Sequence, residues 1–366
     1  MRRTLPVLLA TVIIAAGCLR APAEEADLNF GYALDPFALA SIPQYQAIVA
    51  NDATMVTVEN YMKWGLIHPN PSTYDFTLAD QIVATAQANG QQVRGHVLVW
   101  HTQLPGWLTN GTWTRDSLLA VMEDHITTVV THFRDNFPGV VTHWDVVNEA
   151  FNPDGSRRDT IFQQVIGDDY IEKAFAFARA ADPDISLFYN DFYDDFSLAG
   201  ETLLTGVPAG PGATPTQSDC AQLPKCAATQ AMLTDFVARG VPIDGLGFQA
   251  HVLLGQAPDY VELADWVGPL GLEWAATELD VKVLSSLGDN SATRSAHADT
   301  FVSVLDDCLE SDRCDTVILW GVGDAHSWLP GFTNGLFDYG LIYDDDYLPK
   351  LAVVKMFERL EAASVD

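Results

Sequence analysis

The sequence predicts a single (β/α)8 barrel with its active site at the carboxyl ends of the strands. Eight short apolar runs of β-prone residues recur along the 366-residue chain, and amphipathic, alanine-rich stretches separate most of them. Strand and helix therefore alternate throughout, which favours a barrel. A doubly wound open sheet is the alternative, but no glycine-rich phosphate loop follows the first expected strand.

The eight apolar runs give the expected strands in order, at residues 29–34, 54–58, 92–100, 140–148, 185–190, 245–252, 272–279 and 316–322. Helical periodicity between them predicts helices at residues 78–88, 116–137, 169–181, 229–238 and 293–308. Glycine or proline stands just after several of these elements, as at Gly90, Pro138, Pro183 and Gly240.

The first 23 residues have the character of an export signal, with arginines followed by an apolar stretch too short for an ordinary membrane helix. Cleavage after Ala23 would leave residues 24–366 as one catalytic barrel. The run IAAGC, which ends at Cys18, resembles a lipoprotein signal, so that residues 1–17 would be removed and Cys18 lipidated. Small residues directly before Cys18 slightly favour the lipid anchor. Both routes predict an exported protein, either secreted or held at the cell envelope.

Four further cysteines form two pairs that are close in sequence. Three pairings are possible in an oxidising compartment, and the simplest joins Cys220 to Cys226 and Cys308 to Cys314. Zinc is not expected, because neither pair has CxxC spacing and no histidine lies close by.

The chain is strongly acidic, with a formal net charge of −30. Residues 1–23 carry three arginines and no acid, so their removal would change this charge to −33. Such a charge argues against nucleic acids and anionic surfaces as partners and is compatible with a neutral polymer substrate. Tolerance of high salt and plain solubility are both consistent with it.

Polar and aromatic residues follow nearly every expected strand, where a barrel builds its active site. A single such residue is usually just solvated, but a set at almost every strand end indicates a site. Glu149 follows the fourth run and Glu278 ends the seventh. A facing pair of carboxylates suits glycosidic bond cleavage, in which one protonates the leaving oxygen and the other attacks the anomeric carbon or activates a water.

Six motifs occur in order between about residues 28 and 358: VTVENYMKW, QVRGHVLVWHTQLPGW, WDVVNEAF, GFQAH, TELD and WGVGDAHSW. Together they resemble glycoside hydrolase family 10, whose typical member is an endo-β-1,4-xylanase. The resemblance implies endo-acting, retaining hydrolysis of internal β-1,4-xylosidic bonds in xylan or xylo-oligosaccharides. It makes Glu149 the acid/base and Glu278 the nucleophile, and Asn148 the partner of the sugar 2-hydroxyl next to the cleaved bond.

Divided roles require different environments for the two carboxyl groups. We expect burial and the charge of Glu278 to raise the pKa of Glu149. His251 is placed to hydrogen-bond Glu278, and Asp280 to orient His251. A retaining enzyme should hold its two carboxyl groups roughly 5–5.5 Å apart. No metal or cofactor is expected.

Residues of the motifs also predict the substrate contacts. Aromatic rings can stack on the apolar face of a sugar, and polar groups can bind its hydroxyl rim. The expected stacking residues are Trp100, Trp320 and Trp328, and the expected hydroxyl-binding residues are Glu59, Asn60, Lys63, His96, Gln103 and Gln249. The resemblance places Glu59, Asn60, Lys63 and Trp328 near the second sugar on the non-reducing side.

The chain departs from the family pattern at two places. Leu329 stands where members commonly carry arginine, and the segment from Asp194 to Lys225 is longer than the pattern needs. Three other functions remain as alternatives: a β-1,4-glucanase on the same scaffold, a barrel that binds polysaccharide without cutting it, and a metal-dependent hydrolase that uses His96, His101, His143 and His251. We expect a monomer.

Overall fold

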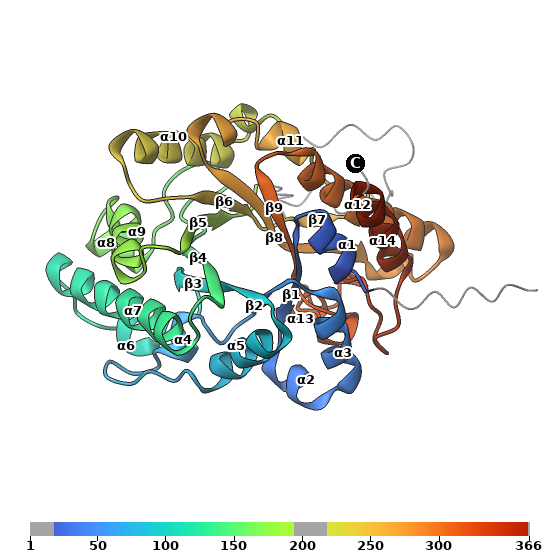
Figure 1. Ribbon diagram of the computed structural model, residues 1–366. Coiled ribbons are helices and arrows are strands. Elements are labelled where there is room, and N and C mark those ends of the chain that lie inside the picture. Colours follow the sequence, from blue (N-terminus) through green and yellow to red (C-terminus); the bar gives the residue numbers. More distant parts are fainter. Residues whose placement is uncertain (1–17, 194–217, 365–366) are drawn as a thin grey trace, which may run out of the picture.

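Eight parallel strands close into a barrel in the computed structural model, which describes residues 18–193 and 218–364 (Figure 1). Strand β9 pairs with β8 on one side and with β1 on the other, so the sheet has no free edge among these eight strands. The prediction of a barrel is confirmed, and the open-sheet alternative is wrong. The barrel strands are β1 (Asn29–Leu34), β2 (Met55–Val58), β3 (Gln92–Val99), β4 (Val141–Asn148), β5 (Ser186–Asp191), β6 (Gly245–Phe248), β8 (Glu273–Leu284) and β9 (Cys314–Leu319).

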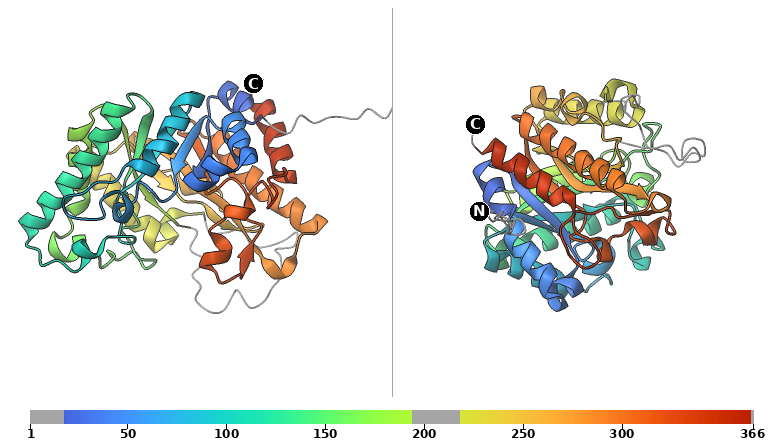
Figure 2. Two further views of the ribbon diagram at one scale, coloured as in Figure 1. Left: turned by 90° about the horizontal axis from the view of Figure 1, so that it is seen from below. Right: turned by 90° about the vertical axis from the view of Figure 1, so that its right-hand side faces the viewer.

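Helices surround the strands on the outside of the barrel (Figures 1 and 2). The longer ones are α3 (Pro43–Asp52), α5 (Thr77–Asn89), α7 (Arg115–Asn136), α9 (Tyr170–Ala181), α10 (Pro224–Arg239), α12 (Ser291–Glu310) and α14 (Leu351–Ala363). Shorter helices are α1 (Arg20–Glu25), α2 (Pro36–Ser41), α4 (Trp64–Ile67), α6 (Gly106–Thr109), α8 (Ile161–Val165), α11 (Tyr260–Leu263) and α13 (Leu329–Phe332).

Local sequence explains where several helices begin and end. Thr114 caps α7 in a capping box with Ser117, which satisfies backbone N–H groups of the first turn. Helices α5 and α10 stop at Gly90 and Gly240, which both adopt the left-handed conformation that favours glycine. Pro224 begins α10, five residues before the predicted start, because proline is pre-organised for the first helical position.

One expected strand, residues 245–252, is two strands in the structure. Strand β6 ends at Phe248 and β7 (His251–Leu253) begins after a break at Ala250, whose φ is +59°. Among the described residues, strand β7 pairs with β8 alone, with His251 opposite Asp280. The break therefore turns His251 toward the middle of β8. Strand β8 itself runs to Leu284, five residues beyond the predicted end, and is joined there by β10 (Phe337–Asp338).

Residues 18–25 pack against the barrel. Leu19 and Ala23 are fully buried. The Leu19 backbone donates a hydrogen bond to buried Asp52, and Arg20 donates to the carbonyl oxygens of Asn89 and Gly90 at the end of α5. The predicted signal at residues 1–17 lies outside the described residues. No helix of the described ranges is long and apolar enough to cross a membrane.

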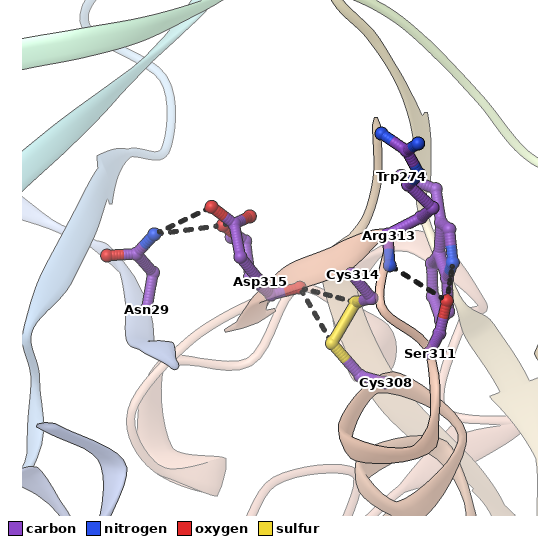
Figure 3. Close-up of a disulfide and its surroundings, with 8 residues drawn as sticks. Asn29, Trp274, Cys308, Ser311, Arg313, Cys314 and Asp315 are labelled. Carbon is purple, nitrogen blue, oxygen red and sulfur yellow. Dashed lines mark hydrogen bonds between the residues drawn. A yellow bond between two sulfur atoms is a disulfide. The ribbon is translucent and has the colours of Figure 1, made fainter. Parts of the chain in front are cut away.

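Both predicted disulfides are present. Cys220 and Cys226 join the start of α10 to the preceding turn, with Cα atoms 5.2 Å apart. Cys308 and Cys314 join α12 to β9, with Cα atoms 5.0 Å apart. Figure 3 shows the second disulfide near Asp315 of β9, whose side chain accepts a hydrogen bond from Asn29 of β1 across the closing strand pair. This disulfide therefore stands beside the seam where the barrel closes.

Candidate active site

Glu149 lies at the mouth of the barrel, directly after β4, in a turned backbone conformation. Its φ is +55°, in the left-handed region that few non-glycine residues adopt. Its backbone N–H donates to the carbonyl oxygen of Asn190 at 3.0 Å, and its own carbonyl accepts from Nε of Arg158 at 2.9 Å. These contacts hold an unfavourable conformation, as is common at functional sites, and turn the carboxyl group away from the line of the strand.

Glu278 lies in β8 between an amide and an imidazole. Asn190 donates to Oε1 at 2.7 Å, and Nε2 of His251 lies 3.2 Å from Oε2. The other ring nitrogen of His251 lies 3.0 Å from Oδ2 of Asp280, which also accepts from the Trp328 indole at 2.6 Å. The structure thus places Asp280 where the sequence predicts an orienting group for His251.

The charge of His251 follows from these neighbours. Burial lowers the pKa of His251, but the charges of and hydrogen bonds to Asp280 and Glu278 outweigh burial and raise its pKa to about 10. At neutral pH the imidazolium therefore stands between two carboxylates. Its positive charge lies 3.2 Å from Oε2 of Glu278, and a carboxylate is the form of this side chain that can attack a carbon atom.

Three amide side chains connect the two carboxyl groups. Gln249 donates to Oε1 of Glu149 at 2.9 Å, and its amide lies 3.2 Å from that of Asn148. The amides of Asn148 and Asn190 meet at 3.0 Å, and Asn190 contacts Glu278. Strands β4, β5, β6 and β8, which are neighbours in the barrel, supply this row of side chains or lead directly into it. The structure therefore joins both predicted catalytic residues in one polar network.

The expectation of a raised pKa for Glu149 is wrong, because the surroundings of this carboxyl group lower it. Burial raises the pKa of Glu149, but hydrogen bonds from Gln249 and Trp100, together with nearby His101 and Lys225, bring it below its ordinary value. His101 lies 3.8 Å from Oε2 of Glu149, and burial lowers its own pKa to about 4. Burial could be expected from the sequence, but the number of donors that face one carboxylate depends on the fold.

A second polar cluster follows β2. Nζ of Lys63 donates to Oδ1 of Asn60 at 3.0 Å, and Asn60 donates to Glu59 at 3.1 Å. Gln103 also donates to Oδ1 of Asn60, at 3.3 Å. Burial raises the pKa of Glu59 and lowers that of Lys63. The structure therefore brings together four of the residues predicted to bind sugar hydroxyls.

Lys63 links this cluster to the carboxylates. Its Nζ lies 5.1 Å from the ring centre of Trp100 and 5.6 Å from that of Trp320. The negative charges of Glu278 and Glu149 oppose the lowering of its pKa, so both carboxylates act on the same ammonium group. The two polar clusters thus share one electrostatic environment.

The remaining predicted contacts lie around the same mouth. His96 is held by Asp145, 2.9 Å from Nδ1, and packs edge-on against Trp320 with ring centres 5.2 Å apart. Trp320 is 7% exposed, so little of its ring is accessible in this state. Trp328 is half-buried, and its ring centre lies 4.9 Å from that of His251.

Other residues from the sequence analysis take different places. His143 lies beside Phe188 and contacts Thr142. Within residues 18–193 and 218–364, no group of three or more histidine, cysteine or acidic side chains is arranged to hold a metal ion.

Leu329, the departure from the family arginine, begins α13 and is fully buried. A Cβ atom added at Gly340 would lie 2.3 Å from the Leu329 side chain. Leu329 therefore packs tightly against the backbone at Gly340 and does not project into the solvent. Most of the segment from Asp194 to Lys225, which is longer than the family pattern needs, lies outside the described residues.

The catalytic and substrate-binding residues predicted from the sequence do not include Asn190. In the structure Asn190 donates a hydrogen bond to Glu278 and accepts one from Thr277. Its position at the end of β5, next to Asn148 in β4, was the available signal, because neighbouring strands of a barrel bring their ends together.

A closed (β/α)8 barrel with a connected pair of carboxylates at its mouth is typical of glycoside hydrolases. The model of Glycosyl hydrolase family 10 matches residues 18–202 and 218–359, and the chain belongs to this family. It is 33% identical over 347 residues to endo-1,4-beta-xylanase B of Thermotoga neapolitana, covering 94% of this chain and 91% of the relative.

Solved structures agree with this assignment. Native xylanase 10B from Thermotoga maritima is 34% identical with a TM-score of 0.82, over 95% of this chain and 99% of the other. Xylanase 10B from Thermotoga petrophila RKU-1, solved in complex with xylobiose, is 34% identical with a TM-score of 0.81, over 94% and 98% of the two chains.

Proposed function

We propose that the protein is an endo-1,4-β-xylanase that cleaves internal bonds of xylan by double displacement, with Glu278 as nucleophile and Glu149 as acid/base. Relatives named endo-1,4-beta-xylanases over more than nine-tenths of the chain support the substrate class. The different surroundings of the two carboxyl groups carry the mechanism: Glu278 contacts the His251 imidazolium, whereas Glu149 contacts amides and His101, whose pKa of about 4 leaves it neutral.

In the first step Glu278 attacks the anomeric carbon while Glu149 donates a proton to the leaving oxygen. Glu149 must therefore take up a proton that its low pKa in the free site disfavours. A sugar in the cleft excludes water and competes for the donor of Gln249, and both effects raise the pKa of Glu149. Substrate binding thus favours the protonated form of Glu149, which is the form that can act as the acid.

In the second step a water replaces the enzyme at the anomeric carbon. Formation of the glycosyl ester removes the negative charge of Glu278, which lowers the pKa of Glu149 again. Glu149 then accepts a proton from the attacking water, the sugar is released, and Glu278 regains its charge. Two inversions retain the anomeric configuration, a geometry that requires carboxyl groups roughly 5–5.5 Å apart.

The polar cluster of Glu59, Asn60 and Lys63 is assigned to the second sugar on the non-reducing side of the cleaved bond. Asn148, placed between the two carboxyl groups in the amide row, is assigned to the 2-hydroxyl of the sugar that reacts. A hydrogen bond to that hydroxyl strengthens as positive charge develops on the ring. Trp100, Trp320 and Trp328 are assigned to the apolar sugar faces.

We also propose that the protein works outside the cytoplasm as a monomer, either secreted or anchored through a lipid on Cys18. The apolar segment before Cys18 supports export. The buried positions of Leu19 and Ala23 support processing at Cys18, since cleavage after Ala23 would remove packed residues.

Release of reducing ends from xylan, mixed-linkage glucan, carboxymethyl cellulose and mannan tests this function, with wild type, Glu278→Ala and Glu149→Ala side by side. We expect xylan cleavage that both substitutions abolish, and proton NMR of the first product should show retained configuration. Cleavage of glucan alone would make the protein a glucanase. Folded wild type that cleaves no polymer would point to a polysaccharide-binding protein.

A further inference from the structure

A buried ion pair lies behind the strand end that carries Glu149. Nζ of Lys225 is 2.7 Å from Oδ1 of Asp191, and the two side chains are 4% and 0% exposed. The same Nζ lies 3.0 Å from the ring centre of Phe192. Removal of two charges from water is costly, so a buried pair is poor evidence of added stability. The groups that the pair contacts therefore indicate its role better than its contribution to stability does.

One tyrosine connects Asp191 to the backbone beside Glu149. The Tyr189 hydroxyl donates to Oδ2 of Asp191 at 2.5 Å and accepts from the backbone N–H of Ala150 at 2.9 Å. These groups are buried, so water cannot replace either contact. Because the hydroxyl proton points to an ionised carboxylate, the oxygen lone pairs face Ala150. The charge on Asp191 thus sets the direction of both hydrogen bonds.

We propose that Lys225 is a positioning residue for Glu149, in a role that deepens the proposed hydrolysis and rests on it. Lys225 keeps Asp191 ionised, and Asp191 orients the Tyr189 hydroxyl. That hydroxyl holds Ala150, the residue after Glu149, and so fixes the turn that presents the Glu149 carboxyl to the glycosidic oxygen.

Loss of the ammonium group would change the state of Asp191. Burial raises the pKa of Asp191 to about 6, and the charge of Lys225 already opposes that rise. Without Lys225 the pKa of Asp191 would rise further, which increases the protonated fraction at neutral pH, and a protonated carboxyl group is itself a donor. Tyr189 would then have no fixed direction for its proton, and the turn at Ala150 would lose its defined acceptor.

The fold also fixes Lys225 from the other side. Lys225 stands in the first turn of α10, between Pro224 at the helix start and Cys226. Cys226 is tied to Cys220 of the preceding turn by the disulfide. A short segment that the disulfide cross-links therefore holds the ammonium group next to Asp191, as expected for a residue whose position matters.

The experiment compares two substrates in the full-length protein. Xylan has a poor leaving group that needs protonation by Glu149, whereas 2,4-dinitrophenyl β-xylobioside has a leaving group that needs none. We expect Lys225→Met to lower kcat/KM on xylan by about tenfold or more and on the aryl glycoside by less than about threefold, because general acid catalysis contributes 10²–10⁴-fold. Lys225→Arg should restore most xylan activity, and Tyr189→Phe should give the same substrate split.

Lys350→Met is the control, because Lys350, whose side chain is 18% exposed, forms an ion pair with buried Asp324 on another part of the fold. It should leave the ratio of the two kcat/KM values unchanged. Equal losses on both substrates in Lys225→Met and Tyr189→Phe, or no loss in either, would overturn the inference. Wild-type inactivity on xylan would instead overturn the proposed function. If Lys225→Met does not fold, Tyr189→Phe alone decides.

Discussion

Gln249 donates a hydrogen bond of 2.9 Å to Oε1 of Glu149, the carboxyl group proposed to act as the acid. A donor to a carboxylate stabilises the ionised form, so this contact opposes protonation in the free enzyme. The first half of the reaction needs the opposite state. The site therefore holds Glu149 in its ionised form, which the second half of the reaction requires. The substrate has to raise the pKa of Glu149 when it binds, so that the first half can proceed.

Removal of this donor should move the pH profile of kcat/KM, which reports the free enzyme. In Gln249→Met the pKa of Glu149 rises, so the group keeps its proton to higher pH and the basic limb moves upward in pH. The maximum should fall, because Gln249 is also assigned to substrate. Gln91→Met is the control, since Gln91 is a buried amide that hydrogen-bonds Val49 and Ala53 far from the carboxylates. An unmoved basic limb in Gln249→Met would contradict the assignment of Glu149.

Asp280→Asn tests the charge on His251. A raised pKa means that the contacts of His251 stabilise the fold fully below its ordinary value of about 6.5, and that this contribution is lost as pH rises through about 10. Asparagine keeps an acceptor but removes one negative charge, so the pKa of His251 should fall. We expect the alkaline loss of stability to move to lower pH and kcat/KM on xylan to fall by about 10–100-fold, because a hydrogen bond to a charged group contributes about 1.5–3 kcal/mol.

NMR titration of the His251 ring gives the direct measurement for this variant. The wild-type ring should stay protonated through pH 9, and the Asp280→Asn ring should lose its proton earlier. Identical titration of the two rings would show that Asp280 does not control the charge.

The sequence predicts the strands well and the contacts between them poorly. The run at residues 92–100 is rich in β-prone apolar residues and ends in Val97–Trp100, so its strand needs no tertiary information to be recognised. The break at Ala250 is different, because its positive φ is supported by contacts with other strands, such as the Gln249 N–H to the Asp191 carbonyl. No local pattern reveals that support.

The same distinction explains the errors within the site. Asn190 and Glu278 are 88 residues apart in sequence, and only the closed barrel brings them together. The pKa of Glu149 was expected from one neighbouring charge and from burial, but its direction depends on how many donors converge on the carboxylate. Motifs identify which residues meet, whereas the balance of their interactions depends on distances.

A buried stack of aromatic rings should make the fold sensitive to acid. His125 is fully buried, lies 3.7 Å from Trp64 between ring centres, and contacts His68 at 3.3 Å between Nδ1 atoms. Burial lowers the pKa of His125 well below its ordinary value. The unfolded chain therefore binds a proton near pH 6.5 that the folded chain excludes, so this group costs stability progressively as pH falls below 6.5.

His125→Phe keeps an aromatic ring on Trp64 and removes the titration. We expect its free energy of unfolding to decline less than that of wild type between pH 7 and pH 5, by about 2 kcal/mol for one proton. Urea unfolding at the two pH values measures the difference. His132→Gln, in the same helix at a partly exposed site, is the control. Parallel decline in wild type and His125→Phe would show that the stack does not cause acid sensitivity.

Loss of either disulfide should lower stability, but only loss of the disulfide between Cys220 and Cys226 should lower activity. Each closes a loop between cysteines six residues apart, and the chain-entropy model assigns about 2 kcal/mol to a loop of this size. We expect Cys308→Ala/Cys314→Ala to lower the thermal midpoint and leave kcat/KM on xylan unchanged. Cys220→Ala/Cys226→Ala should lower both, because that disulfide holds the segment that carries Lys225. The same activity in both double variants would show that the position of Lys225 does not depend on its disulfide.

The packing of residues 19–23 indicates which of the two expected cleavage sites, before Cys18 or before Glu24, leaves the more stable chain. Leu19 and Ala23 are fully buried, and Arg20 caps the end of α5 through Asn89 and Gly90. The Leu19 N–H also donates to Asp52, a buried carboxyl group whose pKa burial raises to about 6. Removal of residues 18–23 would uncover apolar surface and take a donor from Asp52. A chain that begins at Glu24 should therefore unfold at lower temperature than one that begins at Leu19.

Mass spectrometry of the exported protein measures the end that the cell makes. We expect a lipid-modified Cys18, and Cys18→Ala should abolish that mass and release the protein from membranes. An unmodified chain beginning at Glu24, with the same thermal midpoint as the longer chain, would show that α1 is dispensable and that the ordinary signal cleavage applies. The stability comparison tests only whether residues 18–23 support the fold, so the mass of the exported chain decides which bond is cleaved.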